Sequence, residues 1–194
     1  MKNLISYFVL ILLLTTNNPV RAQVGLNAGF GTGSVIDFFE FTESVGSLIF
    51  FPFTQISNKT IDKVGPFYVE LFTYDDERLK FVLHYSYSSN TRLYYRNSDD
   101  SEVRREKNVY HTAMAGSQYA YVKSENFEVY LGIYTGISLR ENTAVGKPDE
   151  DFTKQYFAYQ ISPVGFRFGR GFGFTFELGF GFKGIVSGGV SLRL

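Results

Sequence analysis

The stretch from Phe172 to Lys183 reads FGFTFELGFGFK and alternates strictly between large apolar and small or polar side chains. Its apolar face carries Phe172, Phe174, Phe176, Leu178, Phe180 and Phe182. Its other face carries Gly173, Thr175, Glu177, Gly179, Gly181 and Lys183. A period of two kept over this length predicts one β-strand, about twice as long as most strands of soluble proteins.

Glycine occupies most of the second face, and this limits the kind of sheet that the strand can join. A soluble sandwich turns Lys, Glu, Thr or Gln to water, whereas glycine inside a strand costs backbone entropy and packs against nothing. Small residues suit the crowded interior of a narrow closed barrel, and an unbroken apolar face suits lipid. The stretch therefore predicts a transmembrane β-barrel in which the six apolar side chains from Phe172 to Phe182 face lipid.

The same alternation recurs along the chain and predicts eight strands, at 24–33, 66–74, 79–95, 108–122, 127–140, 155–169, 171–183 and 185–194. Their connections alternate between short (75–78, 123–126, 169–171) and long (34–65, 96–107, 141–154), and only the outer connection at Gly184 is tight. Short periplasmic turns and long outer loops are typical of outer-membrane barrels. The predicted fold is therefore an all-β, eight-stranded antiparallel up-and-down transmembrane β-barrel.

The first long connection contains an unusually apolar segment, Val35 to Phe53. Its strand periodicity is poor, and Pro52 disfavours a central strand. Two interpretations remain open. The segment is a short amphipathic helix or lies on the lipid interface, or residues 35–42 and 47–55 form an extra hairpin, which gives a barrel of ten strands.

The first 22 residues have the features of a secretory signal peptide. Lys2 precedes an apolar run, Leu4 to Leu14, and Val20 and Ala22 occupy the −3 and −1 positions of a cleavage site before Gln23. The apolar run is too short to span a bilayer. We therefore expect a signal peptide over 1–22, cleaved near Ala22, and one barrel domain over 23–194.

Composition excludes several classes of protein. The chain has no cysteine, which excludes disulfide scaffolds, thiolate metal sites and thiol nucleophiles. Its 19 Lys and Arg residues balance its 19 Asp and Glu residues, which argues against a nucleic-acid partner. No His-x-His, HExxH or acidic ligand-binding loop occurs, so we expect neither a metal nor a cofactor.

Polar residues on the inward faces are the candidate site. By depth along the strands, Asn27, Glu70, His84, Gln160 and Glu177 lie near mid-barrel, and Lys80, Glu128, Arg167 and Arg193 lie nearer the periplasmic end. Eight strands leave an interior only wide enough for side chains, and buried ions are tolerated when they are paired. The sequence therefore predicts a polar network that fills the lumen, made of Glu70, Lys80, His84, Glu128, Arg167, Glu177 and Arg193. A gated path for protons or small ions is the alternative.

The last eight residues, SGGVSLRL, resemble the C-terminal signal that the barrel-assembly machinery reads, through Ser187, Gly189, Leu192 and Leu194. The usual terminal aromatic residue is replaced by Leu194. Together with the strand pattern, the chain resembles the small eight-stranded outer-membrane barrels, such as the OmpX proteins and the membrane domain of OmpA. Its glycine-rich first strand and long first loop also resemble outer-membrane barrels of Bacteroidota. The resemblance implies an outer-membrane location, with outer-membrane lipid and the assembly machinery as partners.

Three functions are compatible with this pattern. The first is a noncatalytic barrel with a closed polar lumen and a structural role, or a role in binding a surface partner through outer loops such as 99–107 and 147–151. The second is a narrow, porin-like channel. The third is a lipid A-modifying enzyme, which needs a histidine beside an activated serine on the outer rim. His111 has only Thr112 beside it, so no catalytic residue is assigned.

Overall fold

A computed structural model describes residues 23–35, 56–74, 78–96, 101–144 and 152–193 of the chain. They form eight strands: β1 (Gln23–Thr32), β2 (Ile56–Tyr74), β3 (Leu79–Arg96), β4 (Glu102–Lys123), β5 (Phe127–Ala144), β6 (Phe152–Phe168), β7 (Phe172–Gly181) and β8 (Val186–Arg193). No helix among these residues is long and apolar enough to cross a membrane.

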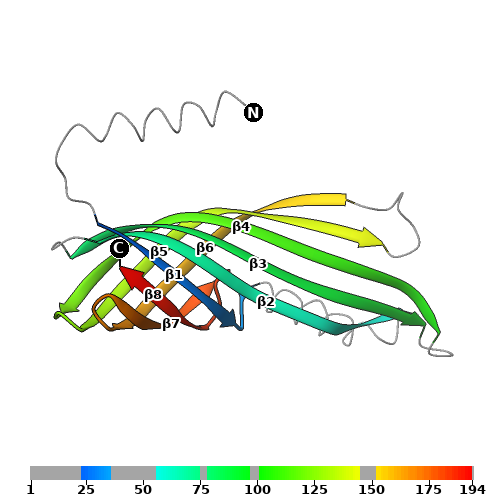
Figure 1. Cartoon of the computed structure of the whole chain (residues 1–194). Helices are drawn as coiled ribbons and strands as arrows, with labels where there is room; N and C mark the ends of the chain where they lie inside the picture. The colour runs from blue at the N-terminus through cyan, green and yellow to red at the C-terminus, as the bar shows by residue number, and fades with distance from the viewer. Residues whose placement is uncertain (1–22, 36–55, 75–77, 97–100, 145–151, 194) are drawn as a thin grey trace, which may run out of the picture.

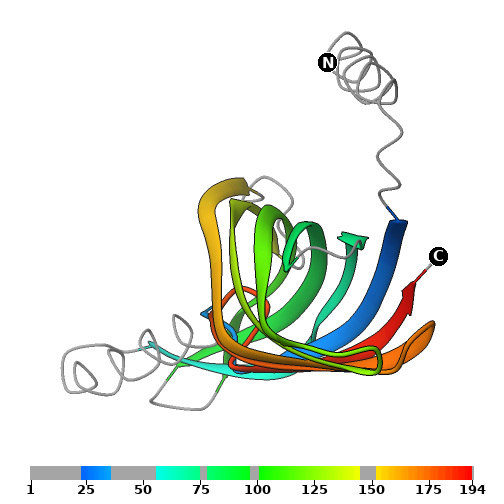
Figure 2. The ribbon, with the colours of Figure 1, turned by 90° about the vertical axis from the view of Figure 1, so that its left-hand side faces the viewer.

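The eight strands form one closed antiparallel barrel in sequence order (Figure 1, Figure 2). Leu26 of β1 pairs with Leu71 of β2 on one side and with Leu192 of β8 on the other, which closes the ladder. The predicted eight-stranded up-and-down barrel is confirmed. The ten-stranded alternative is wrong, because β1 pairs directly with β2 and leaves no place for two strands between them. The conformation of the apolar segment after Val35 lies outside the described residues.

Several strands are longer than predicted. β2 begins at Ile56 instead of residue 66, β4 begins at Glu102 instead of 108, and β5 continues to Ala144. These extensions carry polar residues on both faces, so they lack the alternation that marks the rest of each strand. Backbone pairing still holds them in the sheet, as between Lys59 and Leu93. Much of the predicted long loops is therefore sheet.

The barrel wall is uneven in height. β1, β7 and β8 contain 10, 10 and 8 residues, whereas β2 to β6 contain between 17 and 22. In Figure 1 the five long strands extend beyond the other three, away from the end where β1 begins and the chain terminates. We call that end the base. The extension is the upper wall, made of residues 56–66, 88–96, 102–110, 138–144 and 152–159.

Side chains alternate between an apolar exterior and a largely polar interior. On β7, Phe172, Phe174, Phe176, Leu178 and Phe180 all face outward, with exposed fractions from 39% to 61%. Phe182 does not, since only 4% of it is exposed, so its assignment to the lipid face is wrong. The strand ends at Gly181, whose φ is +148°, and the Phe182 N–H then donates to the Tyr159 carbonyl over 3.0 Å. This turn directs the Phe182 ring inward.

The inward turn of Phe182 builds an apolar layer in the barrel. Phe182 follows β7 and Val35 follows β1, so both stand where short strands end. They belong to one cluster with residues of the long strands, which include Tyr110, Met114, Tyr134 and Ala158. The same cluster includes Phe72, whose ring centroid lies 4.4 Å from the Arg167 guanidinium, so the apolar layer packs beside the polar residues of the interior.

Candidate functional site

The interior of the barrel holds all seven residues of the predicted polar network. Six of them expose 3% or less of their surface, and the Arg193 side chain exposes 8%. The structure groups them into two clusters. The central cluster contains Glu70, His84 and Glu177 around Lys183, and the base cluster contains Lys80, Arg167 and Arg193 around Glu128.

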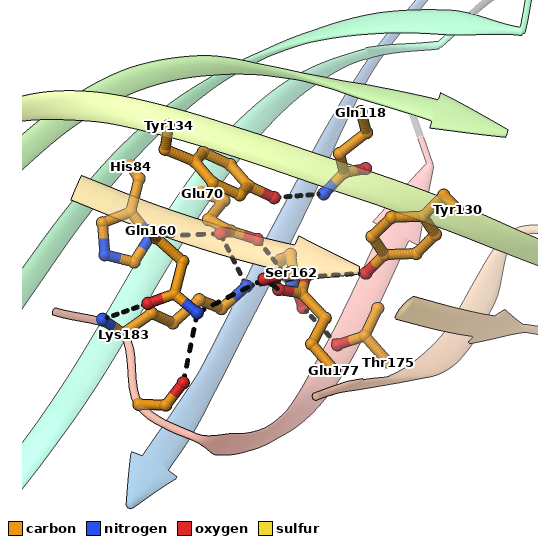
Figure 3. Close-up of polar contacts among 12 residues, drawn as sticks. Glu70, His84, Gln118, Tyr130, Tyr134, Gln160, Ser162, Thr175, Glu177 and Lys183 are labelled. Carbon is orange, nitrogen blue, oxygen red and sulfur yellow. Dashed lines mark hydrogen bonds and ion pairs between the residues drawn. The ribbon is translucent and has the colours of Figure 1, made fainter. Parts of the chain in front are cut away.

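Lys183 is the centre of the central cluster (Figure 3). Its Nζ donates to Glu70 Oε1 over 2.8 Å and to Glu177 Oε1 over 2.7 Å. The same ammonium lies 4.3 Å from the centroid of the Tyr68 ring. One buried cation therefore joins β2 and β7 across the lumen, with an aromatic face as a further contact.

The two carboxylates of the central cluster are fully hydrogen-bonded. Glu70 accepts from Asn27 Nδ2 over 2.7 Å, and His84 Nδ1 lies 3.1 Å from its other oxygen. Glu177 accepts from the Tyr130 hydroxyl over 2.7 Å and from Ser162 Oγ over 3.0 Å. Buried carboxylates are tolerated when they have such partners, so the cluster is suited to hold the strands together.

Gln160 fixes the turn that carries Lys183 inward. Its Oε1 accepts from the Lys183 N–H over 3.0 Å, and its Nε2 donates to the Gly184 carbonyl over 3.1 Å (Figure 3). Gly184 has φ +124°, in the region that favours glycine. The turn and the ammonium are therefore positioned by one amide on β6.

The base cluster gathers three cations on one carboxylate. Glu128 accepts from Lys80 through Oε1 and from Arg167 Nη1 through Oε2, the second over 2.7 Å. Arg193 Nη2 lies 3.4 Å from the same Oε2. The Arg167 guanidinium also stacks 4.4 Å from the Phe72 ring centroid and 4.9 Å from that of Tyr130.

Uncharged side chains connect the two clusters. Gln118 Oε1 accepts from Arg167 Nη2 over 2.8 Å, and Gln118 Nε2 donates to the Tyr134 hydroxyl over 2.8 Å. Tyr130 contacts Arg167 with its ring and Glu177 with its hydroxyl. Ion pairs, hydrogen bonds and the cation–π contact of Arg167 with Tyr130 therefore connect Arg193 at the base to Lys183.

The glycines of the inner face make room for these rings. A Cβ on Gly165 would lie 2.3 Å from Tyr130 Cε2, and one on Gly25 would lie 2.2 Å from Phe72 Cζ. Any larger residue at these positions would displace a ring that contacts Arg167. The glycine-rich face predicted from the sequence thus serves the packing of the lumen.

Sequence reasoning missed the residue with the most central position. The alternation places Lys183, Tyr130 and Tyr134 on inward faces, but the predicted network does not include them. The signal available for Lys183 was a single lysine inside an otherwise apolar and glycine-rich stretch.

His111 lies on the outer surface, outside the network. Its Nδ1 is 2.8 Å from the Tyr85 hydroxyl, and its ring lies 5.6 Å from that of Tyr87. Thr112 points the opposite way and its Oγ1 lies 2.8 Å from the Ser138 hydroxyl inside the barrel. The groups around His111 are thus aromatic, and Thr112 is not positioned to act with it. Among the residues that the structure describes, no three His, Asp or Glu side chains are grouped to hold a metal ion.

The residues of the predicted assembly signal lie along β8. Ser187 is buried, Leu192 is 40% exposed on the outer surface, and a Cβ on Gly189 would lie 2.4 Å from the Ala28 carbonyl oxygen. Leu194 lies outside the described residues. That this segment is read during assembly stays a prediction.

Comparisons with known proteins do not assign the chain to a family. No protein-family profile matches the chain, and no curated protein sequence matches it. Among solved structures, the chain is similar to Ail, the attachment invasion locus protein of Yersinia pestis, crystallised with the heparin analogue sucrose octasulfate. The match covers 89% of this chain and 94% of Ail, at 11% sequence identity and a TM-score of 0.43. The barrel architecture rests on the strand pairing described above.

Proposed function

We propose that this chain is a noncatalytic barrel of the bacterial outer membrane whose lumen does not conduct and whose upper wall acts at the cell surface. The observation that carries the proposal is the contrast between the two sides of the wall. The outside is apolar and the inside is charged and paired, which is the reverse of a soluble protein.

Every strand contributes exposed apolar side chains to the exterior. They include Leu26, Leu71, Phe81, Tyr119, Ile133, Ile161, Phe174 and Val190. Monomeric soluble proteins rarely expose apolar patches beyond a few hundred Å², whereas a lipid bilayer favours such a surface. The closed ladder also satisfies the backbone hydrogen bonds within the bilayer.

The height of the apolar band fits a membrane. On β3 the outward side chains are apolar or aromatic from Leu79 to Tyr87, and then Ser89 and Thr91 follow. This span agrees with the roughly 9–11 residues of a tilted transmembrane strand. Lys107 and Glu141 face outward above the band, so we place the upper wall outside the membrane. The signal peptide, cleavage near Ala22, and recognition of β8 by the assembly machinery belong to the same proposal.

The upper wall supports a role at the cell surface. Pairing between β1 and β2 extends only to Phe30 and Phe67, and pairing between β6 and β7 only to Gln160 and Gly181. Among the described residues, the upper parts of β2 and β6 therefore pair on one side only. A tall sheet outside the bilayer, with two such edges, offers a surface for a partner.

The closed lumen argues against a channel. The ammonium of Lys183 lies between two carboxylates, and Phe182 and Met114 are buried in the apolar cluster that shares the interior with it. In an eight-stranded barrel these side chains occupy the space that a water column needs. No observation among the described residues favours the porin-like alternative.

Three measurements test the proposal. The protein should fractionate with outer membranes, migrate differently on SDS gels before and after boiling, and give no steady conductance in planar bilayers. Identical migration together with a soluble fraction would contradict the membrane placement. Large and reproducible channels would contradict the closed lumen and favour the porin-like function.

A further inference from the structure

Two cations face each other directly on the inner face of the upper wall. Arg140 of β5 and Lys154 of β6 are register partners in the antiparallel pair. Arg140 is half-buried and Lys154 is exposed, so both are accessible to solvent at the upper end of the barrel. Like charges directly opposite each other across two strands are destabilising.

The surroundings of this pair contain aromatic rings and amides. The Arg140 guanidinium carbon lies 5.7 Å from the Phe152 ring centroid, and Lys154 Nζ lies 5.0 Å from the same centroid. Arg140 is also 6.0 Å from the Tyr110 ring centroid, and its Nε donates to Asn108 Oδ1 over 3.0 Å. Within the described part of the chain, neither cation contacts a carboxylate.

Glu106, an acidic residue on the inner face of the upper wall, is paired with other side chains. Glu106 Oε1 lies 2.6 Å from Arg104 Nε in an ion pair, and Glu106 accepts a hydrogen bond from Asn142 Nδ2 over 2.9 Å. The cations lower in the barrel differ from the upper pair, because Lys183, Lys80 and Arg167 all contact a carboxylate. Among the described residues, these lumen cations are thus paired with carboxylates, whereas the two adjacent positive charges at the mouth are not.

We propose that Arg140 and Lys154 together bind one phosphate group of a ligand that enters the barrel mouth from the upper end. A guanidinium can donate two parallel hydrogen bonds to phosphate, and an ammonium binds it as a point charge. A phosphate monoester carries a charge of about −1.5 to −2 near neutral pH, which matches the two positive charges.

The same strand pair has room for the rest of such a ligand. An open hollow of about 300 Å³ is lined by Glu141, Asn142, Thr143, Phe152 and Thr153. Phe152 lines this hollow and also contacts both cations. Asn142 and Phe152 stand on the inner face with the two cations, whereas Glu141, Thr143 and Thr153 stand on the outer face, so the hollow lies over the ends of the two strands. A sugar or other polar group that carries the phosphate can therefore lie against Asn142 and Phe152. The inference depends on the fold alone, so it can hold or fail independently of the membrane placement.

The test uses the folded barrel in detergent, titrated calorimetrically with inorganic phosphate, glucose 6-phosphate and, as a ligand without phosphate, glucose. We expect both phosphates to bind and glucose not to bind. Stronger binding of glucose 6-phosphate would identify a phosphate ester as the ligand, and equal binding would identify the phosphate group alone as what is recognised.

Four variants test which residues are responsible. Lys154→Gln should weaken phosphate binding about tenfold, as expected for the loss of one charge-assisted contact, and Lys154→Arg should keep most of it. Lys154→Glu should abolish binding and raise the melting temperature of the ligand-free protein, because Arg140 then gains a carboxylate. Lys107→Gln, on the outer face of β4, is the matched control and should bind as the wild type does.

Two results would overturn the inference. One is a wild-type barrel that does not bind phosphate more tightly than chloride at equal ionic strength. The other is equal phosphate binding by Lys154→Gln and Lys107→Gln, since a general effect of net charge would then explain it. The SDS-gel mobility of each variant shows that it has folded before it is titrated.

Discussion

Lys183 and Glu177 are six residues apart in the chain, yet the Lys183 ammonium lies 2.7 Å from the Glu177 carboxylate inside the barrel. The contact is possible because the chain reverses between Gly181 and Ile185, where the Gly179 N–H donates to the Ile185 carbonyl over 2.8 Å. The reversal carries the ammonium back toward the middle of the lumen, where it also reaches Glu70. A short turn between two short strands thus supplies the cation of the central cluster.

Replacement of Glu177 should destabilise the barrel in proportion to the contacts that are lost. Glu177→Ala removes one carboxylate from Lys183 and leaves the Tyr130 and Ser162 hydroxyls without their acceptor. We expect a loss of roughly 3–5 kcal/mol in the free energy of unfolding, as for other broken buried pairs. Glu177→Gln keeps an acceptor oxygen and should cost less. Urea unfolding in detergent or lipid measures both values.

An exposed ion pair provides the control for this experiment. Glu102 accepts two hydrogen bonds from Arg105, and both side chains are more than 40% exposed. Glu102→Ala should therefore cost only about 0–1 kcal/mol. If Glu102→Ala and Glu177→Ala had equal effects, the central cluster would have no special role in stability.

The outward face of β7 should not tolerate a charge near its middle. Phe176 is 39% exposed on the outer surface, and Thr175 beside it is 4% exposed inside. If the exterior faces lipid, Phe176→Arg costs roughly 2–4 kcal/mol near the bilayer midplane. Thr175→Ser keeps the hydroxyl that donates to Asn27 Oδ1 over 3.0 Å and should fold normally. Equal folding yields of the two variants in lipid vesicles would rule out a lipid-facing β7.

A methyl group added to Gly165 should disturb the lumen. Its Cβ would lie 2.3 Å from Tyr130 Cε2, and Tyr130 is held by Glu177 through its hydroxyl and by Arg167 through its ring. Because the ring cannot move away freely, Gly165→Ala should cost about 1–3 kcal/mol, as overpacking usually does. Gly171→Ala is the control, since no atom lies within 4 Å of a Cβ there. Urea unfolding measures both variants. If Gly165→Ala and Gly171→Ala had the same unfolding midpoint, the glycines of the inner face would not be needed to make room for the rings.

The fold could be predicted from the sequence wherever one face of a strand is apolar. Alternation located the eight strands and the outward face of β7 from Phe172 to Phe180. Alternation does not predict the strand where both of its faces are polar, as at Lys59 and Lys63 in β2. There, backbone pairing alone holds the upper wall in the sheet.

The candidate site was harder to predict than the fold. Depth along a strand places Glu70, His84 and Glu177 at one level of the barrel, and each of the three lies on a regular strand. Lys183 and Phe182 follow a turn, and the direction of their side chains depends on Gly181 and on the contacts of Gln160. The upper pair, Arg140 and Lys154, depends on the register of β5 with β6, which a single sequence does not specify.

Phe180 and Phe182 should respond differently to the same substitution, although the sequence pattern places them on one face. Phe182 is 4% exposed and packs in the apolar layer, so Phe182→Ala should cost about 3–5 kcal/mol through the cavity that it leaves. Phe180 is 46% exposed, and lipid can fill the space that Phe180→Ala leaves, so its cost should be clearly smaller. Urea unfolding in lipid vesicles compares the two variants. If Phe180→Ala were as harmful as Phe182→Ala, or more so, the inward turn after Gly181 would be incorrect and strict alternation would continue through Phe182.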